Sequence, residues 1–175
     1  MKRIRSTSRN GGAPQRVLVI SPHPDDESFG CGGTIREHVT QGASVRVVFL
    51  TSGEKGGHGR NVDETIRMRE SEARAAAKIL GVDAIEFWRE PDGALRSTNG
   101  IVERLRDTFR EWRPQLVYVP HAREMHPDHR AACRLVRRAC VTDFRRLIRQ
   151  RFWSTKCGRR CSESITLSTF PGISR

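Results

Sequence analysis

The sequence predicts an α/β protein in which helices cover both faces of a mostly parallel sheet. Short apolar runs rich in β-branched residues alternate four times with longer segments that carry apolar residues at helical spacing. Because a helix separates each strand from the next, the strands can run parallel with helices packed on both sides. A chain of 175 residues suits a single domain with a substantial core. Ligands of such sheets bind beyond the carboxyl ends of the strands, so function is expected there.

The first strand is expected at Val17–Ile20, an apolar, β-branched run with the length of a buried strand. Ser21-Pro22-His23-Pro24 ends it, because two prolines in three positions cannot continue a hydrogen-bonded ladder. The glycines of Gly30–Gly33 are expected to let a helix pack close to the sheet, and this helix is predicted to run to Gln41, where Gly42 ends it.

The middle of the chain repeats this alternation. Val45–Thr51 is predicted to be a second buried strand, and the glycine-rich loop Ser52–Asp63 after it is long enough to carry function. The best helix pattern in the chain is Thr65–Leu80, which Gly81 ends. A third strand is expected at Ala84–Trp88.

The last part of the predicted domain completes the sheet. Helical spacing over Ile101–Trp112 is closed by Pro114, and the fourth strand is expected at Gln115–Pro120. Asp128 is a candidate cap for a further helix, which could extend to about Arg149. From about residue 144 onward no sustained period of either kind is present, and the pattern predicts no particular structure there beyond that helix extension.

The two ends of the chain differ in charge from its body. The net charge is +12, yet residues 1–16 and 144–175 hold the whole excess, and residues 17–143 are formally neutral. We therefore expect a disordered basic leader at 1–15, an α/β domain at 16–143 and an atypical basic tail at 144–175, the native C-terminal part being truncated or altered. A nucleic-acid-binding domain usually keeps its basic stripe on the folded body, so no specific nucleic acid is expected as a partner.

The composition also bounds the location. No apolar run approaches the length that crosses a bilayer, so no membrane span is expected. The basic N-terminus is not followed by an apolar segment, which argues against a secretory signal. Five cysteines, an odd number without framework spacing, predict reduced thiols in a cytoplasmic protein.

Two turns that combine histidine and acidic residues each follow a predicted strand. Asp25-Asp26-Glu27 comes directly after the first turn, and so much negative charge in one place is costly unless a cation neutralises it. His126-Pro127-Asp128-His129 follows the fourth strand. If the two strand ends converge, His23, Asp26 and one of the later histidines surround one ion. Two imidazoles and one carboxylate with an open fourth position form the ligand set of a catalytic zinc site.

Asp25 would then be free to take a proton from water at this site. The simpler alternatives are that a His-Pro turn is only a turn and that adjacent aspartates only cap a helix. Two such turns, each at a predicted strand end, favour the metal site. Glu54 and His58, in the long loop, either reach the site or face solvent.

These motifs resemble those of the PIG-L/LmbE-like N-acetylglucosaminyl de-N-acetylases. The resemblance rests on His23-Pro24-Asp25-Asp26-Glu27 and His126-Pro127-Asp128-His129, with the sequence GCGGT between them. Arg69-Glu70-Ser71-Glu72-Ala73 and Pro91-Asp92-Gly93 support it more weakly. It covers about Val17–Ala139 and implies a Rossmann-like three-layer sandwich.

The resemblance implies a metal centre and a general base. His23, Asp26 and His129 would bind Zn²⁺, or another divalent metal in its place. Asp25 would be the general base that takes a proton from the attacking water as it adds to an acetamide carbonyl.

The resemblance also implies supporting roles around that centre. His126 would stabilise the oxyanion or assist proton transfer to the leaving amine, and Asp128 would orient a histidine. Arg69 and Asp92 would contact the substrate. The alternatives for these two residues are a solvated helix arginine and a turn former.

The function that the resemblance implies is zinc-dependent hydrolysis of an N-acetyl group. The substrate would be a small amino-sugar conjugate that carries N-acetylglucosamine, and the bond broken would be a linear amide C–N bond. The alternative is a catalytically inactive, truncated family member that still binds metal, because the family continues well past the helix that begins at His129. Nucleic-acid binding through the basic ends ranks last, and an oligomer is possible.

Overall fold

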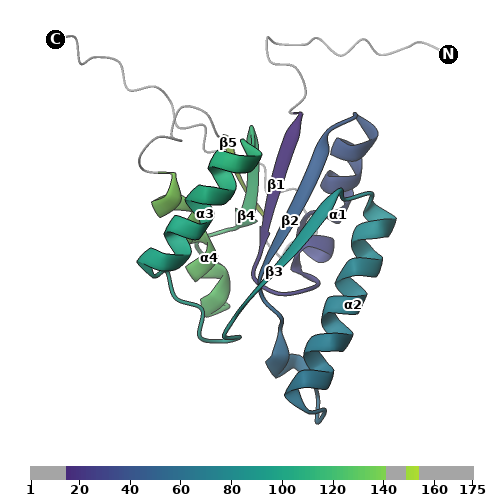
Figure 1. Cartoon of the computed structure of the whole chain (residues 1–175), viewed down its shortest axis with the longest axis vertical. Coiled ribbons are helices and arrows are strands. Elements are labelled where there is room, and N and C mark those ends of the chain that lie inside the picture. The colour runs from purple at the N-terminus through teal and green to yellow at the C-terminus, as the bar shows by residue number, and fades with distance from the viewer. Residues whose placement is uncertain (1–14, 141–148, 154–175) are drawn as a thin grey trace.

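The computed structural model describes residues 15–140 and 149–153, and Figure 1 shows how their elements are arranged. Along the chain these elements are β1 (Arg16–Ser21), α1 (Asp26–Thr40), β2 (Ser44–Thr51), the 3₁₀ helix η1 (Glu54–Gly56), α2 (Val62–Leu80), β3 (Ala84–Glu90), α3 (Asn99–Trp112), β4 (Leu116–Pro120), α4 (Pro127–Ala139) and β5 (Arg149–Trp153). None of these described helices is long and apolar enough to cross a membrane.

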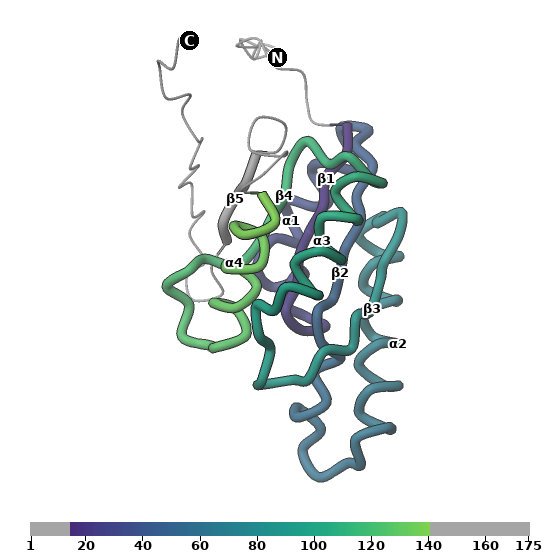
Figure 2. Tube along the Cα trace, turned by 60° about the vertical axis from the view of Figure 1, so that its left-hand side comes forward, coloured from purple at the N-terminus to yellow at the C-terminus, as the bar shows by residue number. Residues whose placement is uncertain are grey.

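The strands form one sheet in the order β3-β2-β1-β4-β5, and each neighbouring pair in this described sheet is parallel. Figure 2 shows β1 in the middle, with β2 and β3 on one side of it and β4 on the other. The strands β2 and β3 are therefore added on one side of β1, and the later strands β4 and β5 are added on its other side. The point of reversal lies between β1 and β4.

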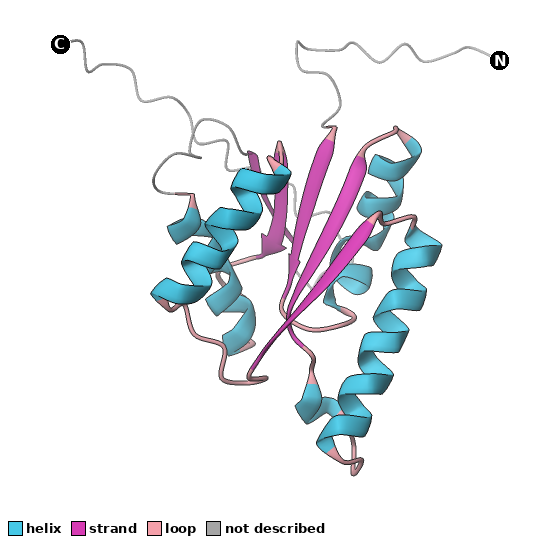
Figure 3. Ribbon diagram, viewed as in Figure 1, coloured by secondary structure: helices cyan, strands magenta, loops and turns pink. Residues whose placement is uncertain are grey.

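The core has two halves, one on each face of the sheet. Val17 and Val19 of β1 pack with Ile35 of α1 on one face. Leu18 of β1 packs with Phe109 of α3 on the other. Figure 3 shows the corresponding layers, with α1 and α2 on one side of the strands and α3 and α4 on the opposite side. This arrangement confirms the predicted α/β class, with a parallel sheet and helices on both faces.

α1 begins at Asp26, four residues before the predicted glycine-rich start. Asp26 and Glu27 occupy its first turn, where negative charge is favoured by the helix dipole. The glycines of Gly30–Gly33 were expected to let this helix pack close to the sheet, and for Gly32 and Gly33 that expectation is wrong. A Cβ on Gly32 would meet its nearest side chain, Leu80, at an ordinary 3.8 Å, and a Cβ on Gly33 would meet nothing within 4 Å.

β5 shows that regular structure continues beyond the predicted last helix. Its register pairs Arg149 with Leu116 of β4, so the expected extension of a helix to Arg149 is wrong. The sequence pattern does not reveal this strand, because residues 149–153 lie in the stretch without a sustained period. The predicted leader, apart from residue 15, lies outside the described residues, as do 141–148 and 154–175 of the C-terminal region.

Replacing Phe109 with alanine is expected to lower the free energy of unfolding by about 3–5 kcal/mol. The Phe109 side chain is fully buried in the core half that α3 and α4 share, so the change leaves a large cavity. Urea unfolding measures the effect. Ile79→Ala is the matched control, because Ile79 is 78% exposed and its loss should change stability by less than about 0.5 kcal/mol. Equal losses in both variants would contradict this core.

Candidate metal and catalytic site

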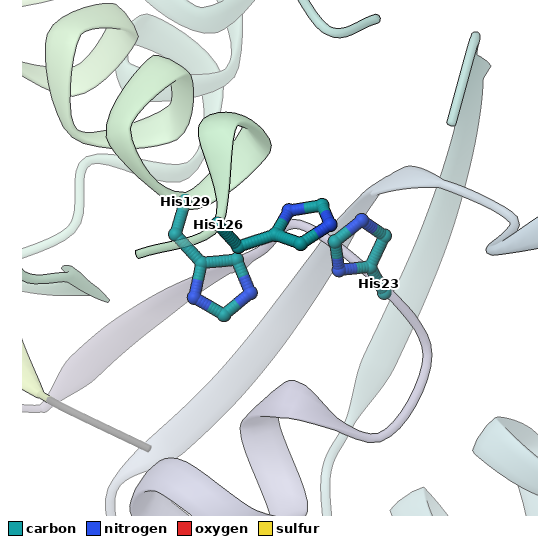
Figure 4. Close-up of side chains that lie close together, drawn as sticks. All are labelled: His23, His126 and His129. Carbon is teal, nitrogen blue, oxygen red and sulfur yellow. The ribbon is translucent and has the colours of Figure 1, made fainter. Parts of the chain in front are cut away.

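The predicted site residues gather at the carboxyl ends of β1 and β4. These strands are hydrogen-bonded neighbours, and the chain order of the sheet reverses between them. Ligands of open parallel sheets bind at this kind of reversal point. His23 lies in the turn after β1, whereas His126 and His129 lie at the start of α4, which follows β4. Figure 4 shows the three imidazoles close together, with His126 and His129 at the start of α4 and the His126 ring facing His23.

One carboxylate oxygen lies between two of these histidines. Asp26 Oδ2 is 2.9 Å from His23 Nδ1 and 3.1 Å from His129 Nε2. It also accepts a hydrogen bond from the His23 backbone N–H at 3.0 Å. Asp26 and His129 are buried, and the His23 side chain is 12% exposed. The structure thus brings together the three residues predicted as metal ligands.

His126 borders the same cluster but is more exposed. Its ring centroid is 4.8 Å from that of His23 and 5.3 Å from that of His129. Its Nδ1 accepts from the Asp128 N–H at 3.3 Å, so His126 is the residue that caps α4. The expectation that Asp128 caps this helix is therefore wrong. The capping bond uses Nδ1 of His126, whose ring stays exposed beside the cluster.

Asp128 binds His23 and a neighbouring loop backbone instead of capping the helix. Its fully buried carboxylate lies 3.1 Å from His23 Nε2 and accepts from the backbone N–H groups of Gly93 and Leu95 at 2.7 and 3.1 Å. Asp92 is also close, with Oδ1 3.2 Å from His23 Nε2. Its other oxygen accepts from the Lys55 N–H at 2.9 Å. Asp92 is thus more than a turn former, and both carboxylates orient His23 from the side opposite Asp26.

The cluster contains more than one set of donors that could hold a cation. His23, His126 and His129 have ligand atoms within 4.8 Å of one another, and so do His23, Asp92 and Asp128. Imidazole nitrogens and carboxylate oxygens in this mixture suit zinc and similar divalent metals. The donor chemistry therefore fits the metal that the resemblance implies.

The electrostatics of the cluster also favour a cation. Burial alone would lower the pKa of His23, but hydrogen bonds to Asp26 and Asp128 and the charge of Asp92 outweigh it and raise that pKa to about 9. Burial raises the pKa of Asp26, yet its bonds to His129 and His23 hold the pKa far below its usual range. The carboxylates at this spot thus stabilise positive charge between them.

Asp25 lies beside this cluster with its side chain 48% exposed. Burial of part of the group raises the pKa of its carboxyl to about 6, although the Arg69 guanidinium acts to lower it. Arg69 Nη2 donates to Asp25 Oδ2 at 2.7 Å. Because Arg69 is only 16% exposed, the alternative of a solvated helix arginine is wrong.

Two further carboxylates lie near the site, and the sequence assigns neither of them a role there. Glu27 is buried and its Oε2 accepts from the Asp25 N–H at 3.1 Å; its place in the acidic run is the available signal. Glu54, for which the sequence allows either position, does reach the site, since its carboxylate accepts from the Asp92 N–H at 2.8 Å. His58 is exposed and belongs to neither donor group found among the described residues.

Glu70 gives a pH dependence to stability. It is buried and its carboxylate accepts from Arg89, Ser52 and Arg74, and the Arg89 bond is the largest cause that lowers its pKa to about 2. A lowered folded-state pKa adds stability above the usual value of 4.5, and this stability is lost as the pH falls from there through about 2.

Glu70→Gln is accordingly expected to cost about 1–2 kcal/mol at pH 7, because both arginine partners are exposed and screened by solvent. The difference from the wild type should shrink as the pH is lowered from 5 toward 2. Urea unfolding at several pH values measures it, and a difference that stays constant over this range would contradict the expectation.

Comparison with known proteins agrees with the resemblance. The family model described as GlcNAc-PI de-N-acetylase matches residues 18–140. The diacetylchitobiose deacetylase of Thermococcus kodakarensis is 36% identical over 123 residues, which cover 67% of this chain and 46% of that protein. The 4-oxalmesaconate hydratase of Pseudomonas putida is 32% identical over 144 residues, which cover 77% of this chain and 55% of that protein. The chain thus spans about half the length of these curated relatives.

The fold is also found among solved structures. The crystal structure of a conserved protein from Thermus thermophilus matches with a TM-score of 0.70 and 33% identity, covering 82% of this chain and 68% of that one. The sequence match covers most of the described α/β body, including both turns that build the candidate site. On this evidence the chain belongs to the PIG-L family of de-N-acetylases.

Proposed function

We propose that this protein is a zinc-dependent hydrolase that removes the N-acetyl group from an N-acetylglucosamine-containing small molecule or conjugate. The observation that carries the proposal is the position of Asp26 Oδ2, about 3 Å from both His23 and His129, with the Asp25 carboxyl in the adjacent position of the chain. The closeness of these groups at the carboxyl ends of β1 and β4 supports a metal-binding set with a base beside it. The family match and the Thermococcus deacetylase support the reaction class.

In the proposed reaction, His23, Asp26 and His129 hold the cation. A bound divalent cation would supply Lewis acidity toward the acetamide carbonyl and make water easier to deprotonate. Asp25 takes a proton from the water that attacks the carbonyl carbon. Its pKa of about 6 leaves it largely ionised at neutral pH, which suits a general base.

The remaining residues support this step. His126, which is exposed at the rim of the cluster, stabilises the oxyanion or passes a proton to the leaving amine. Asp128 orients His23 through its Nε2 atom. The resemblance implies a substrate contact for Asp92, whose two carboxylate oxygens lie against His23 Nε2 and the Lys55 N–H in the structure. The resemblance implies the same for Arg69, but its hydrogen bonds to Asp25, Pro24 and Gly53 join it to the protein itself.

The direct test is acetate release from N,N′-diacetylchitobiose by the purified full chain loaded with zinc. We expect release that stops when the metal is removed with a chelator and returns when zinc is restored. Zinc bound at one equivalent with no release from this or related N-acetylglucosamine conjugates would favour the alternative of an inactive family member that binds metal. Absence of zinc binding would contradict the metal centre itself.

A second candidate is hydration of an unsaturated acid. It is favoured by the Pseudomonas hydratase, which matches a larger share of this chain than the Thermococcus deacetylase does. Such a reaction also needs water activated beside a metal or a base. Loss of the ultraviolet absorbance of 4-oxalmesaconate, without any acetate release from the amino-sugar conjugate, would decide for it.

The cytoplasmic location and an oligomeric state remain predictions.

A further inference from the structure

Arg69 of α2 joins two loops that belong to different strands. Its Nη2 donates to the Pro24 carbonyl at 2.6 Å and to Asp25 Oδ2 at 2.7 Å. Its Nη1 donates to the Gly53 carbonyl at 3.1 Å. One guanidinium therefore ties the turn after β1 to the loop after β2. These three bonds use both terminal nitrogens of the side chain.

Two glycines make room for this guanidinium. A Cβ on Gly56 would lie 2.6 Å from Arg69 Nη1, closer than real Cβ contacts allow. A Cβ on Gly53 would also overlap Arg69, and the backbone of Gly53 has a φ of 65° that favours glycine. The glycine-rich loop after β2 thus forms a seat for Arg69. The length of this loop predicts that it carries function, and holding the Arg69 guanidinium is a function that the loop can have.

Asp25 has a backbone conformation that needs support. Its φ of 123° is unfavourable for a residue with a Cβ. Glu27, which is buried, accepts the Asp25 N–H, and Ser28 Oγ donates to the other Glu27 oxygen at 2.6 Å. The backbone of Asp25 is held from one side by Glu27, and its carboxylate and the preceding carbonyl are held by Arg69.

We propose that Arg69 is a positioning residue that fixes the orientation of the Asp25 carboxylate, and that the space left by Gly53 and Gly56 keeps the Arg69 guanidinium in place. The proposal rests on the proposed function, in which Asp25 is the general base. It differs from the expectation for this family motif, in which Arg69 would contact the substrate. Misplacing a reacting group by about 1 Å can slow a reaction about a hundredfold.

Gly56→Ala tests the seat without changing Arg69 itself. The new methyl group would meet the far end of a flexible side chain, so the guanidinium can move aside while the fold is kept. Arg69→Lys is the second variant, because one ammonium group cannot make all three bonds. Gly100→Ala is the matched control, since a Cβ there meets nothing within 4 Å.

The first readout, amide hydrogen exchange, does not depend on activity. In Gly56→Ala and Arg69→Lys, the amides of residues 25–28 should exchange about tenfold faster than in the wild type, while Gly100→Ala leaves them unchanged. Zinc stoichiometry should stay the same in all three variants, which separates this proposal from the metal centre. Unchanged exchange at residues 25–28 in both test variants would overturn the proposal, whatever the activity.

The second readout is the steady-state kinetics of acetate release from N,N′-diacetylchitobiose. Both test variants should lose about tenfold to a hundredfold in kcat with KM unchanged. A rise in KM with kcat unchanged would show that Arg69 serves substrate binding and would overturn the proposal. If the wild type itself releases no acetate while binding zinc, the proposed function fails, and the exchange result still decides whether Arg69 holds Asp25.

Discussion

Asp25→Asn is expected to lower the rate of acetate release by a factor of about 10² to 10⁴ and to leave zinc binding unchanged. The amide has nearly the shape of the carboxyl, and its oxygen can still accept from Arg69, but it cannot take a proton from water. The candidate metal ligands His23, Asp26 and His129 are untouched by the substitution. We therefore expect a folded, metal-loaded protein that lacks only its base.

Steady-state kinetics on the zinc-loaded variant measure this loss, with bound zinc determined on the same sample. Glu54→Gln is a useful companion, since it changes a nearby carboxylate that accepts from the Asp92 N–H and does not lie between the histidines. It should keep most of the activity, because the amide oxygen can still accept that bond. If Asp25→Asn retained wild-type kcat, Asp25 would not be the base.

The second large effect is expected for His129→Ala, which should weaken zinc binding by about a hundredfold or more. Loss of an orienting partner alone costs about 10- to 100-fold in metal affinity, and loss of a ligand should cost at least as much. The substitution also removes the imidazole that lies 3.1 Å from Asp26 Oδ2. Asp26 would then keep only His23 as its histidine partner in the cluster described here.

Isothermal titration with zinc measures this affinity, and circular dichroism checks that the variant is folded. His58→Asn is the matched control, because His58 is exposed, lies outside both donor groups of the described residues, and has a φ of 47° that asparagine tolerates. The control should bind zinc as the wild type does. Wild-type affinity in His129→Ala would remove His129 from the metal site.

Much of the fold could be predicted from local sequence patterns such as prolines after a strand and a glycine after a helix. The buried strand Arg16–Ser21 stops where Pro22 and Pro24 prevent further pairing, and α2 ends at Gly81, whose φ of 78° suits glycine. Because a helix separates each predicted strand from the next, the order of elements favoured a parallel sheet. The convergence of His23 with His129 then followed from the rule that parallel strands present their carboxyl ends at one edge.

The remainder depended on contacts between distant residues. Asp128 looks like a helix cap in the sequence, yet its carboxylate binds the backbone of Gly93 and Leu95, some 35 positions away. The role of Arg69 depends on its neighbours in space and not on its place in a helix pattern. β5 was not predicted because charged residues interrupt its apolar residues, so the sequence lacks a strand pattern there. Its pairing with β4 identifies it as a strand.

The most direct test of the central claim, that His23, Asp26 and His129 share one divalent cation, is anomalous diffraction at the zinc edge from crystals of the zinc-loaded protein. We predict one strong peak, about 2.0–2.2 Å from a nitrogen of His23, a nitrogen of His129 and an oxygen of Asp26. A peak held instead by His23, Asp92 and Asp128, or no peak at these turns, would contradict the account.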